Sequence, residues 1–303
     1  MCCCRGEQLV GSALDGDKID ARHGGDGNTA TDPTPDRGTV RTMDVGAALG
    51  TYLDIADSVA PGLVEGLYVV GSYALGDWME RTSDIDIVAV TAEPATDEGY
   101  GSLRTVHALL AEHQPLPHID GPYVAWGDLV VEPATGLHRP WTLNGELHHD
   151  GDCFEINPVT WHTLAAHGVT VRGPMVASLG IPTDTEARIR FVVANLQGYW
   201  RDVADGVATA CARPQPPPFT AADLVWCALG PLRLHYTAFT GDVTSKRGAG
   251  EYGLREAPPH LHGVLHAALA ARANGELGPA STDDMRATAA LTRWCIAEVE
   301  TAV

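Results

Sequence analysis

Gly71-Ser72-Tyr-Ala-Leu-Gly-Asp-Trp-Met-Glu-Arg-Thr-Ser-Asp84-Ile85-Asp86 is the stretch of this chain that decides its fold. Apolar runs flank it on both sides, at 67–70 and 87–90. Such runs, separated by a small-residue turn, predict two strands with a turn and a short helix between them. Residues two apart on a strand point to one face, so Asp84 and Asp86 are predicted to be neighbours.

The residue types in this stretch predict phosphate and metal chemistry. Two carboxylates held close together repel unless a cation joins them, and Mg²⁺ prefers oxygen ligands and binds substrate phosphates. A glycine-serine turn such as Gly71-Ser72 offers backbone N–H groups that can cradle a phosphate. Together these features predict metal-dependent nucleotidyl transfer. The competing interpretation is a surface hairpin with a chance D-x-D.

The same stretch resembles the signature of the DNA polymerase beta-type nucleotidyltransferase superfamily. That signature is G-[GS], a spacer of about this length, and D-x-[DE] on the following strand, as in Gly71-Ser72 and Asp84-Ile85-Asp86 here. The resemblance implies that Gly71 and Ser72 hold the phosphates of ATP and that Asp84 and Asp86 bind two Mg²⁺ ions.

Nucleotidyl transfer needs a third carboxylate, to help hold metal and to accept the proton of the attacking hydroxyl. The candidates are Asp120, Asp128 and Glu132. Asp120 precedes an alternating strand pattern at 123–126 and best matches the position of the superfamily's catalytic acid, so we expect it to complete the metal site. The alternative is that Asp120-Gly121-Pro122 is only a turn.

Residues 224–254 carry a second resemblance, to the C-terminal domain of the streptomycin/spectinomycin adenylyltransferases, which are aminoglycoside resistance enzymes. Six positions match the pattern of that family: Arg233, Tyr236, Thr240, Gly241, Lys246 and Gly250. The resemblance implies that Arg233 and Lys246 contact the ATP triphosphate and that Asp223 faces the acceptor. Asp223 also has capping-box spacing from Thr220, so a helix cap is the competing interpretation.

The chain departs from that second family at two places. The family has a tryptophan and an acid just before this helix, where they grip streptomycin, but here the segment is Pro214–Phe219. The tyrosine that stacks on adenine in the family falls in Ala270-Ala271-Arg272. The identity of the acceptor and the way adenine is held are therefore open.

Composition limits the partners. The net charge of −19 over 303 residues argues against nucleic acid, which needs a basic surface. A negative field favours a small cationic acceptor, although it also serves solubility alone. We find no apolar run long enough to span a membrane. The seven cysteines contain no C-x-x-C, which is typical of buried thiols in the cytoplasm.

We predict an α+β protein in three parts. Residues 1–42 are rich in Gly, Asp, Thr and Pro, and we expect a disordered extension, with Met43 as a hypothetical true start that intact-mass analysis would test. Residues 43–172 are predicted to form a nucleotidyltransferase domain, a small mixed sheet flanked by helices. Its expected elements include a helix over 101–113 capped by Ser102 and a strand near 153–157. Residues 184–303 are predicted to form an all-helical domain.

The favoured function is transfer of AMP from ATP to a hydroxyl of a small cationic acceptor, an aminoglycoside or aminocyclitol such as streptomycin or spectinomycin, by a monomeric enzyme. Three alternatives stay open. One is a nucleotidyltransferase for a different small molecule, and another is a protein-adenylylating or antitoxin-type member. The third is a binding protein with an inactive site.

Overall fold

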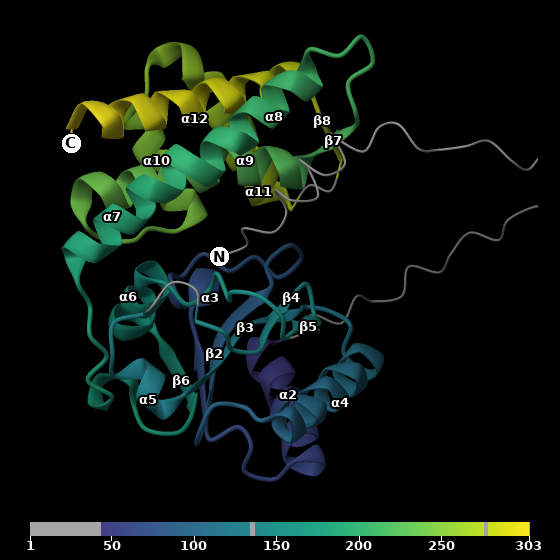
Figure 1. The fold of residues 1–303 in the computed structure, drawn as a ribbon. Helices are drawn as coiled ribbons and strands as arrows, with labels where there is room; N and C mark the ends of the chain where they lie inside the picture. The colour runs from purple at the N-terminus through teal and green to yellow at the C-terminus, as the bar shows by residue number, and fades with distance from the viewer. Residues whose placement is uncertain (1–43, 134–136, 276–277, 303) are drawn as a thin grey trace, which may run out of the picture.

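The computed structural model describes residues 44–133, 137–275 and 278–302. Within them, a mixed sheet with helices on both faces forms one half of the molecule, and a helical half follows it in sequence (Figure 1). This confirms the predicted fold class. The predictions for residues 1–42 and for Met43 as the start lie outside the described residues.

Six strands form the sheet in the order β5-β4-β3-β2-β1-β6. Strands β2 and β3 are parallel, whereas the other neighbouring pairs are antiparallel. The strands are β1 (Gly66–Val69), β2 (Ile85–Thr91), β3 (Ile119–Ala125), β4 (Trp141–Leu143), β5 (Glu146–His148) and β6 (Val169–Arg172). The predicted strand near 153–157 was wrong, because these residues form turns and the extra strands are the β4–β5 hairpin.

Each face of the sheet carries its own apolar core. Helices α2 (Val45–Val59) and α4 (Asp97–His113) cover one face, where residues such as Leu49, Ile87 and Leu103 are buried. The second face packs against α6 (Pro158–His167) through residues such as Val88 and Trp161. Short helices α3 (Gly71–Ala74) and α5 (Trp126–Leu129) follow β1 and β3. Helix α4 is capped by Thr96, not by Ser102 as predicted.

The helical half begins with one long segment that contains a π-helical turn. It comprises α7 (Thr185–Asn195), the π turn Leu196–Trp200 and α8 (Arg201–Cys211). Helices α9 (Ala221–Thr240), α10 (Lys246–Glu256), α11 (His262–Asn274) and α12 (Thr282–Ala302) complete it, with a two-stranded pair, β7 (Phe219–Thr220) and β8 (Pro279–Ala280). No helix of the described residues is long and apolar enough to cross a bilayer.

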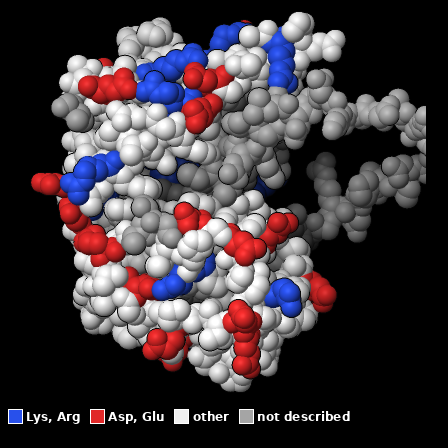
Figure 2. Space-filling view, in the orientation of Figure 1, with Lys and Arg blue, Asp and Glu red and all other residues white. Residues whose placement is uncertain are grey.

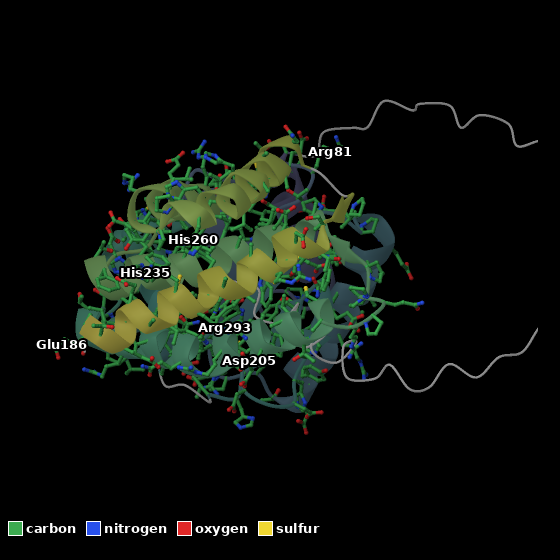
Figure 3. The ribbon with its side chains drawn as sticks, turned by 90° about the horizontal axis from the view of Figure 1, so that it is seen from above. Arg81, Glu186, Asp205, His235, His260 and Arg293 are labelled. Atoms are coloured by element: carbon green, nitrogen blue, oxygen red, sulfur yellow. The ribbon has the colours of Figure 1, made fainter. Side chains whose placement is uncertain are left out.

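Helices α8 and α12 lie side by side and are joined at the surface by ion pairs. Arg293 on α12 donates to Asp205 on α8 at 2.8 Å, and both are labelled in Figure 3. Arg201 makes a second such pair with Glu300, at 2.6 Å. These groups are about half exposed, so each pair adds at most about 1 kcal/mol. Packing of the apolar faces of α8, α9, α11 and α12 is therefore the main source of stability in this half.

A buried ion pair joins the two halves of the molecule. Asp77, in the turn after α3, is 4% exposed, and Arg272 on α11 is 7% exposed. The Arg272 guanidinium donates to Asp77 Oδ2 at 2.9 and 3.2 Å and to the Asp77 carbonyl at 2.5 Å. The backbone N–H of Arg247, on α10, also donates to Asp77 Oδ2, at 3.1 Å. The turn that follows Gly71 is thereby fixed against α10 and α11.

We expect Asp77→Ala to lower the free energy of unfolding by about 3–5 kcal/mol, because it leaves Arg272 buried without its counter-charge. The matched control is Asp205→Ala, which removes an exposed pair and is expected to cost about 1 kcal/mol or less. Urea denaturation of both variants measures the difference. Equal losses in the two variants would show that the Asp77 pair contributes no more than a surface pair.

A buried polar chain lies under the sheet, on the face that α2 and α4 cover. His107 Nε2 lies 2.6 Å from the Tyr123 hydroxyl, which lies 2.8 Å from the Tyr52 hydroxyl. Burial lowers the pKa of His107 from 6.5 to about 4. The folded state therefore holds this imidazole neutral at pH values where the unfolded chain would protonate it.

This pKa shift predicts acid sensitivity. The pKa of His107 is about 4 in the folded state and 6.5 in the unfolded chain. The contribution of the neutral imidazole to stability is therefore complete above pH 6.5 and is lost as the pH falls toward 4. The loss should amount to about 3 kcal/mol. We expect the difference in free energy of unfolding between wild type and His107→Gln to shrink over this pH range, as measured by urea denaturation. A constant difference would contradict the assignment.

Candidate active site

The Gly71 turn is built around the Asp86 carboxylate. Gly71 has φ of +58°, and a Cβ at this position would lie 1.8 Å from Asp86 Oδ2, so the turn requires glycine. The backbone N–H of Ser72 points at the same oxygen, at 3.3 Å. The structure thus brings Gly71, Ser72 and Asp86 together as predicted from the motif. A role for the turn in binding phosphate stays a prediction.

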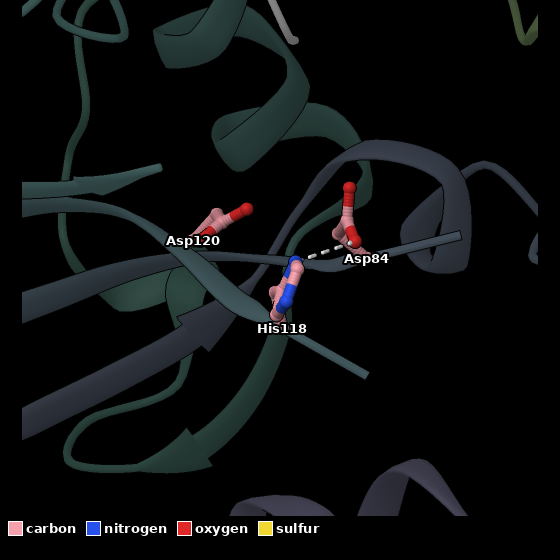
Figure 4. A group of neighbouring side chains, drawn as sticks. All are labelled: Asp84, His118 and Asp120. Atoms are coloured by element: carbon pink, nitrogen blue, oxygen red, sulfur yellow. Dashed lines mark ion pairs between the residues drawn. The ribbon is translucent and has the colours of Figure 1, made fainter. Parts of the chain in front are cut away.

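The two parallel strands bring the three predicted carboxylates to one face of the sheet. Asp86 on β2 is the register partner of Asp120 on β3, and Asp84 directly precedes β2. The ligand atoms of Asp84, Asp120 and a third side chain, His118, lie within 4.8 Å of one another (Figure 4). Carboxylate oxygens and an imidazole nitrogen form a donor set that fits a divalent cation.

Asp120 is held by a hairpin that the sequence analysis did not identify. The β4–β5 turn is Asn144-Gly145, and both residues have positive φ, 51° and 77°. Their backbone N–H groups donate to the two oxygens of Asp120, at 2.8 and 2.9 Å. The side chain is 8% exposed. The hairpin therefore fixes both the position and the rotamer of this carboxylate.

The surroundings of Asp120 also adjust its proton affinity. Burial, helped by the neighbouring charges of Asp84 and Asp86, raises the pKa of Asp120 to about 7, although the two backbone hydrogen bonds act in the opposite direction.

The two competing candidates for the third carboxylate lie elsewhere. Asp128 accepts two hydrogen bonds from Arg139, at 2.8 and 2.9 Å, and a third from the backbone N–H of Ala125 at 2.8 Å. It therefore serves as a structural ion pair at the start of α5. Glu132 is exposed beyond the end of α5. The geometry favours Asp120 among the three.

A cavity of about 300 Å³ lies between the two halves of the molecule. Arg233 on α9 and Lys246 at the start of α10 line it, together with aromatic residues that include Phe154, Trp200 and Trp226. Arg233 donates to the Thr244 carbonyl at 3.1 Å, which fixes the guanidinium beside the cavity. Both cations predicted from the sequence therefore line one cavity.

Electrostatic coupling links Arg233 to the carboxylates of the sheet. Burial lowers the pKa of Arg233, and the charges of Asp86 and Glu155 oppose that shift. Glu155 is itself buried, and its pKa is raised by burial and by Asp86 and lowered by Arg233. Sequence analysis missed Glu155, which lies in a turn segment with no motif around it. The helical half thus places a positive charge close to the acidic face of the sheet.

Asp223 does not line this cavity. Its carboxylate accepts hydrogen bonds from the backbone N–H and the hydroxyl of Thr220, both at 2.8 Å, and Thr220 accepts one from the Asp223 N–H at 3.1 Å. The residue is the acidic member of a capping box at the start of α9. The structure thus agrees with the helix-cap interpretation of Asp223. Contact between Asp223 and an acceptor stays a prediction.

The surface shown in Figure 2 carries acidic and basic side chains on both halves of the molecule, and they are interspersed. The full chain has 39 acidic and 20 basic residues, so acidic groups predominate overall.

Comparison with known proteins agrees with this site. The nucleotidyltransferase domain family matches residues 52–117, which include the Gly71 turn and both aspartates of the D-x-D motif. No curated protein matches the chain. Among solved structures, it is similar to spectinomycin adenyltransferase AAD(9) from Enterococcus faecialis, solved with ATP and spectinomycin. The TM-score is 0.58 at 14% identity, covering 82% of this chain and 98% of that one. The chain therefore contains a match to the nucleotidyltransferase domain family over residues 52–117 and has an aminoglycoside adenylyltransferase-like fold.

Proposed function

We propose that the enzyme transfers AMP from ATP to a hydroxyl of a small acceptor bound between its two halves. The observation that carries this proposal is the cluster of Asp84, Asp86 and Asp120 on one face of the sheet, close to the charge of Arg233. The structurally similar adenyltransferase was solved with ATP, which supports ATP as the nucleotide here.

In this proposal the residues of the site have distinct tasks, and Asp120 has two. Asp84, Asp86 and Asp120 hold two Mg²⁺ ions, which when bound neutralise charge on the phosphates and polarise them. Arg233 and Lys246 bind the triphosphate and stabilise the charge that develops on the leaving pyrophosphate. Gly71 and Ser72 contact the phosphates from the turn. Asp120 accepts the proton of the acceptor hydroxyl as that oxygen attacks the α-phosphorus.

We propose that the acceptor is a cationic aminocyclitol or aminoglycoside, and that a compact molecule of the spectinomycin type fits better than streptomycin. The segment before α9, Pro214–Phe219, lacks the tryptophan and acid typical of streptomycin binding. The similar adenyltransferase was solved with spectinomycin. We also propose that the enzyme is monomeric and acts in the cytoplasm, where ATP is available and thiols stay reduced.

The test is an acceptor panel. Purified enzyme with Mg-ATP is incubated with spectinomycin, streptomycin and related compounds, and pyrophosphate release and product mass are measured. We expect adenylylated spectinomycin, with KM for the acceptor rising as salt screens its attraction to the acidic protein. Modification of only a neutral hydroxyl compound, with no salt dependence, would disprove the cationic acceptor while leaving AMP transfer intact.

A further inference from the structure

His118 lies among the predicted metal ligands, although nothing in the motif assigns it a role. It directly precedes β3, as Asp84 directly precedes β2. The register pairs Ile85 with Ile119, and the Ile85 N–H donates to the His118 carbonyl at 2.8 Å. His118 therefore stands opposite Asp84, two residues before Asp120, and its side chain shares their face of the sheet.

The distances suit a shared ion better than a hydrogen bond. His118 Nδ1 lies 3.5 Å from Asp84 Oδ1, which is longer than a normal N–H···O bond. All three ligand atoms of Asp84, His118 and Asp120 lie within 4.8 Å of one another. Ligands at about 2.0–2.3 Å from one ion are about 3–4.5 Å apart. The side chains point toward a common centre in Figure 4.

The hairpin that fixes Asp120 also packs against the imidazole. A Cβ on Gly145 would lie 3.2 Å from His118 Cδ2. The same turn thus positions two of the three ligands. Other histidine–carboxylate pairs of the described residues, such as His149–Asp150 at 2.9 Å, involve a single carboxylate. Among those residues, the group around His118 is the one with three such ligand atoms close together.

We propose that His118 is a metal ligand beside Asp84 and Asp120, and that it shifts the preference of this site from Mg²⁺ toward Mn²⁺. The reason is chemical: Mg²⁺ favours oxygen ligands and bound water, whereas imidazole favours later first-row ions, and Mn²⁺ accepts both types. An imidazole ligand also adds a donor atom without adding the negative charge of a carboxylate. This inference rests on the metal site of the proposed function and extends it.

The test uses Mn²⁺ alone with the full-length protein, without ATP or acceptor. Electron spin echo spectroscopy of bound Mn²⁺ detects the nitrogen of a coordinated imidazole, and loss of the free-ion signal gives the affinity. We expect a ¹⁴N coupling in wild type and in the control His149→Ala, and none in His118→Ala or His118→Asn. The two His118 variants should bind Mn²⁺ at least about tenfold more weakly, with a smaller loss of Mg²⁺ affinity measured by competition.

The outcomes separate this inference from the proposed function. Tight Mn²⁺ binding with no ¹⁴N coupling in wild type would show that His118 only pairs with Asp84, and would overturn the inference while leaving the carboxylate metal site. A wild-type coupling that persists in both folded His118 variants would assign it to another histidine and would also overturn it. AMP transfer is measured separately, so its absence with an intact ¹⁴N coupling would count against the proposed function alone.

Discussion

Asp86→Asn is expected to abolish AMP transfer while the chain stays folded. The substitution removes the charge of a proposed metal ligand and one of the negative charges near Arg233. It also reduces repulsion with Asp120, and the asparagine carbonyl can still accept from the Ser72 N–H, so stability should hold or rise. Turnover and thermal unfolding of the variant measure both effects.

The control for this variant is Asp205→Asn, a carboxylate of the helical half at an exposed ion pair. It should keep full turnover. If folded Asp86→Asn retained more than a few per cent of wild-type activity, the assignment of Asp86 to the metal site would be wrong. A variant that fails to fold is excluded by its thermal unfolding curve.

Asp120→Ala is expected to slow turnover by about 10²–10⁴-fold, the usual contribution of a general base. Asp120→Asn separates the chemistry from the packing, because asparagine can still accept a hydrogen bond from the Asn144-Gly145 turn. Both variants should therefore lose turnover, and Asp120→Asn should keep more of the stability. Steady-state kinetics with saturating ATP and denaturation curves measure these losses.

Asp128→Ala and Glu132→Ala are the comparison variants, since the sequence left both residues as candidates. We expect Asp128→Ala to lower stability by breaking the pair with Arg139, with little effect on the rate of folded enzyme. Glu132→Ala should have little effect on either, because its side chain is exposed. A large rate loss in one of these two, with normal turnover in Asp120→Ala, would show that the third carboxylate is misassigned.

The sequence predicted the centre of the site because its residues lie close together in the chain. Gly71 lies in the turn after β1, and Asp86 lies on the next strand, β2. The pattern of residues therefore predicted both the alternation along the strand and the need for glycine in the turn. The C-terminal cations were predicted from the family resemblance. That both cations would line one cavity with residues of the segment 152–159 could not be predicted, because it depends on packing between the two halves, including the Asp77–Arg272 pair.

The features that the sequence analysis missed depend on contacts distant in sequence. Asn144-Gly145 is a strong hairpin signal between alternating residues, and it could have predicted β4 and β5. That the turn would hold Asp120 could not be predicted, because the contact spans about 25 residues. His118 shares the strand alternation of Asp120, but its approach to Asp84 depends on the parallel register of β2 and β3. The helix start at Thr96 was missed because the run Thr96-Asp97-Glu98 was not recognised as a capping signal.

The central claim is that the α-phosphorus of ATP is the atom attacked, and position-specific labelling tests it most directly. Enzyme, Mg²⁺ and spectinomycin are incubated in parallel with ATP labelled at the α- or the γ-phosphate, and the acceptor is isolated. We predict that the acceptor carries the α label and that the γ label leaves in pyrophosphate, with no transfer by Asp86→Asn. Appearance of the γ label on the acceptor, or release of labelled orthophosphate as the only product, would contradict the account.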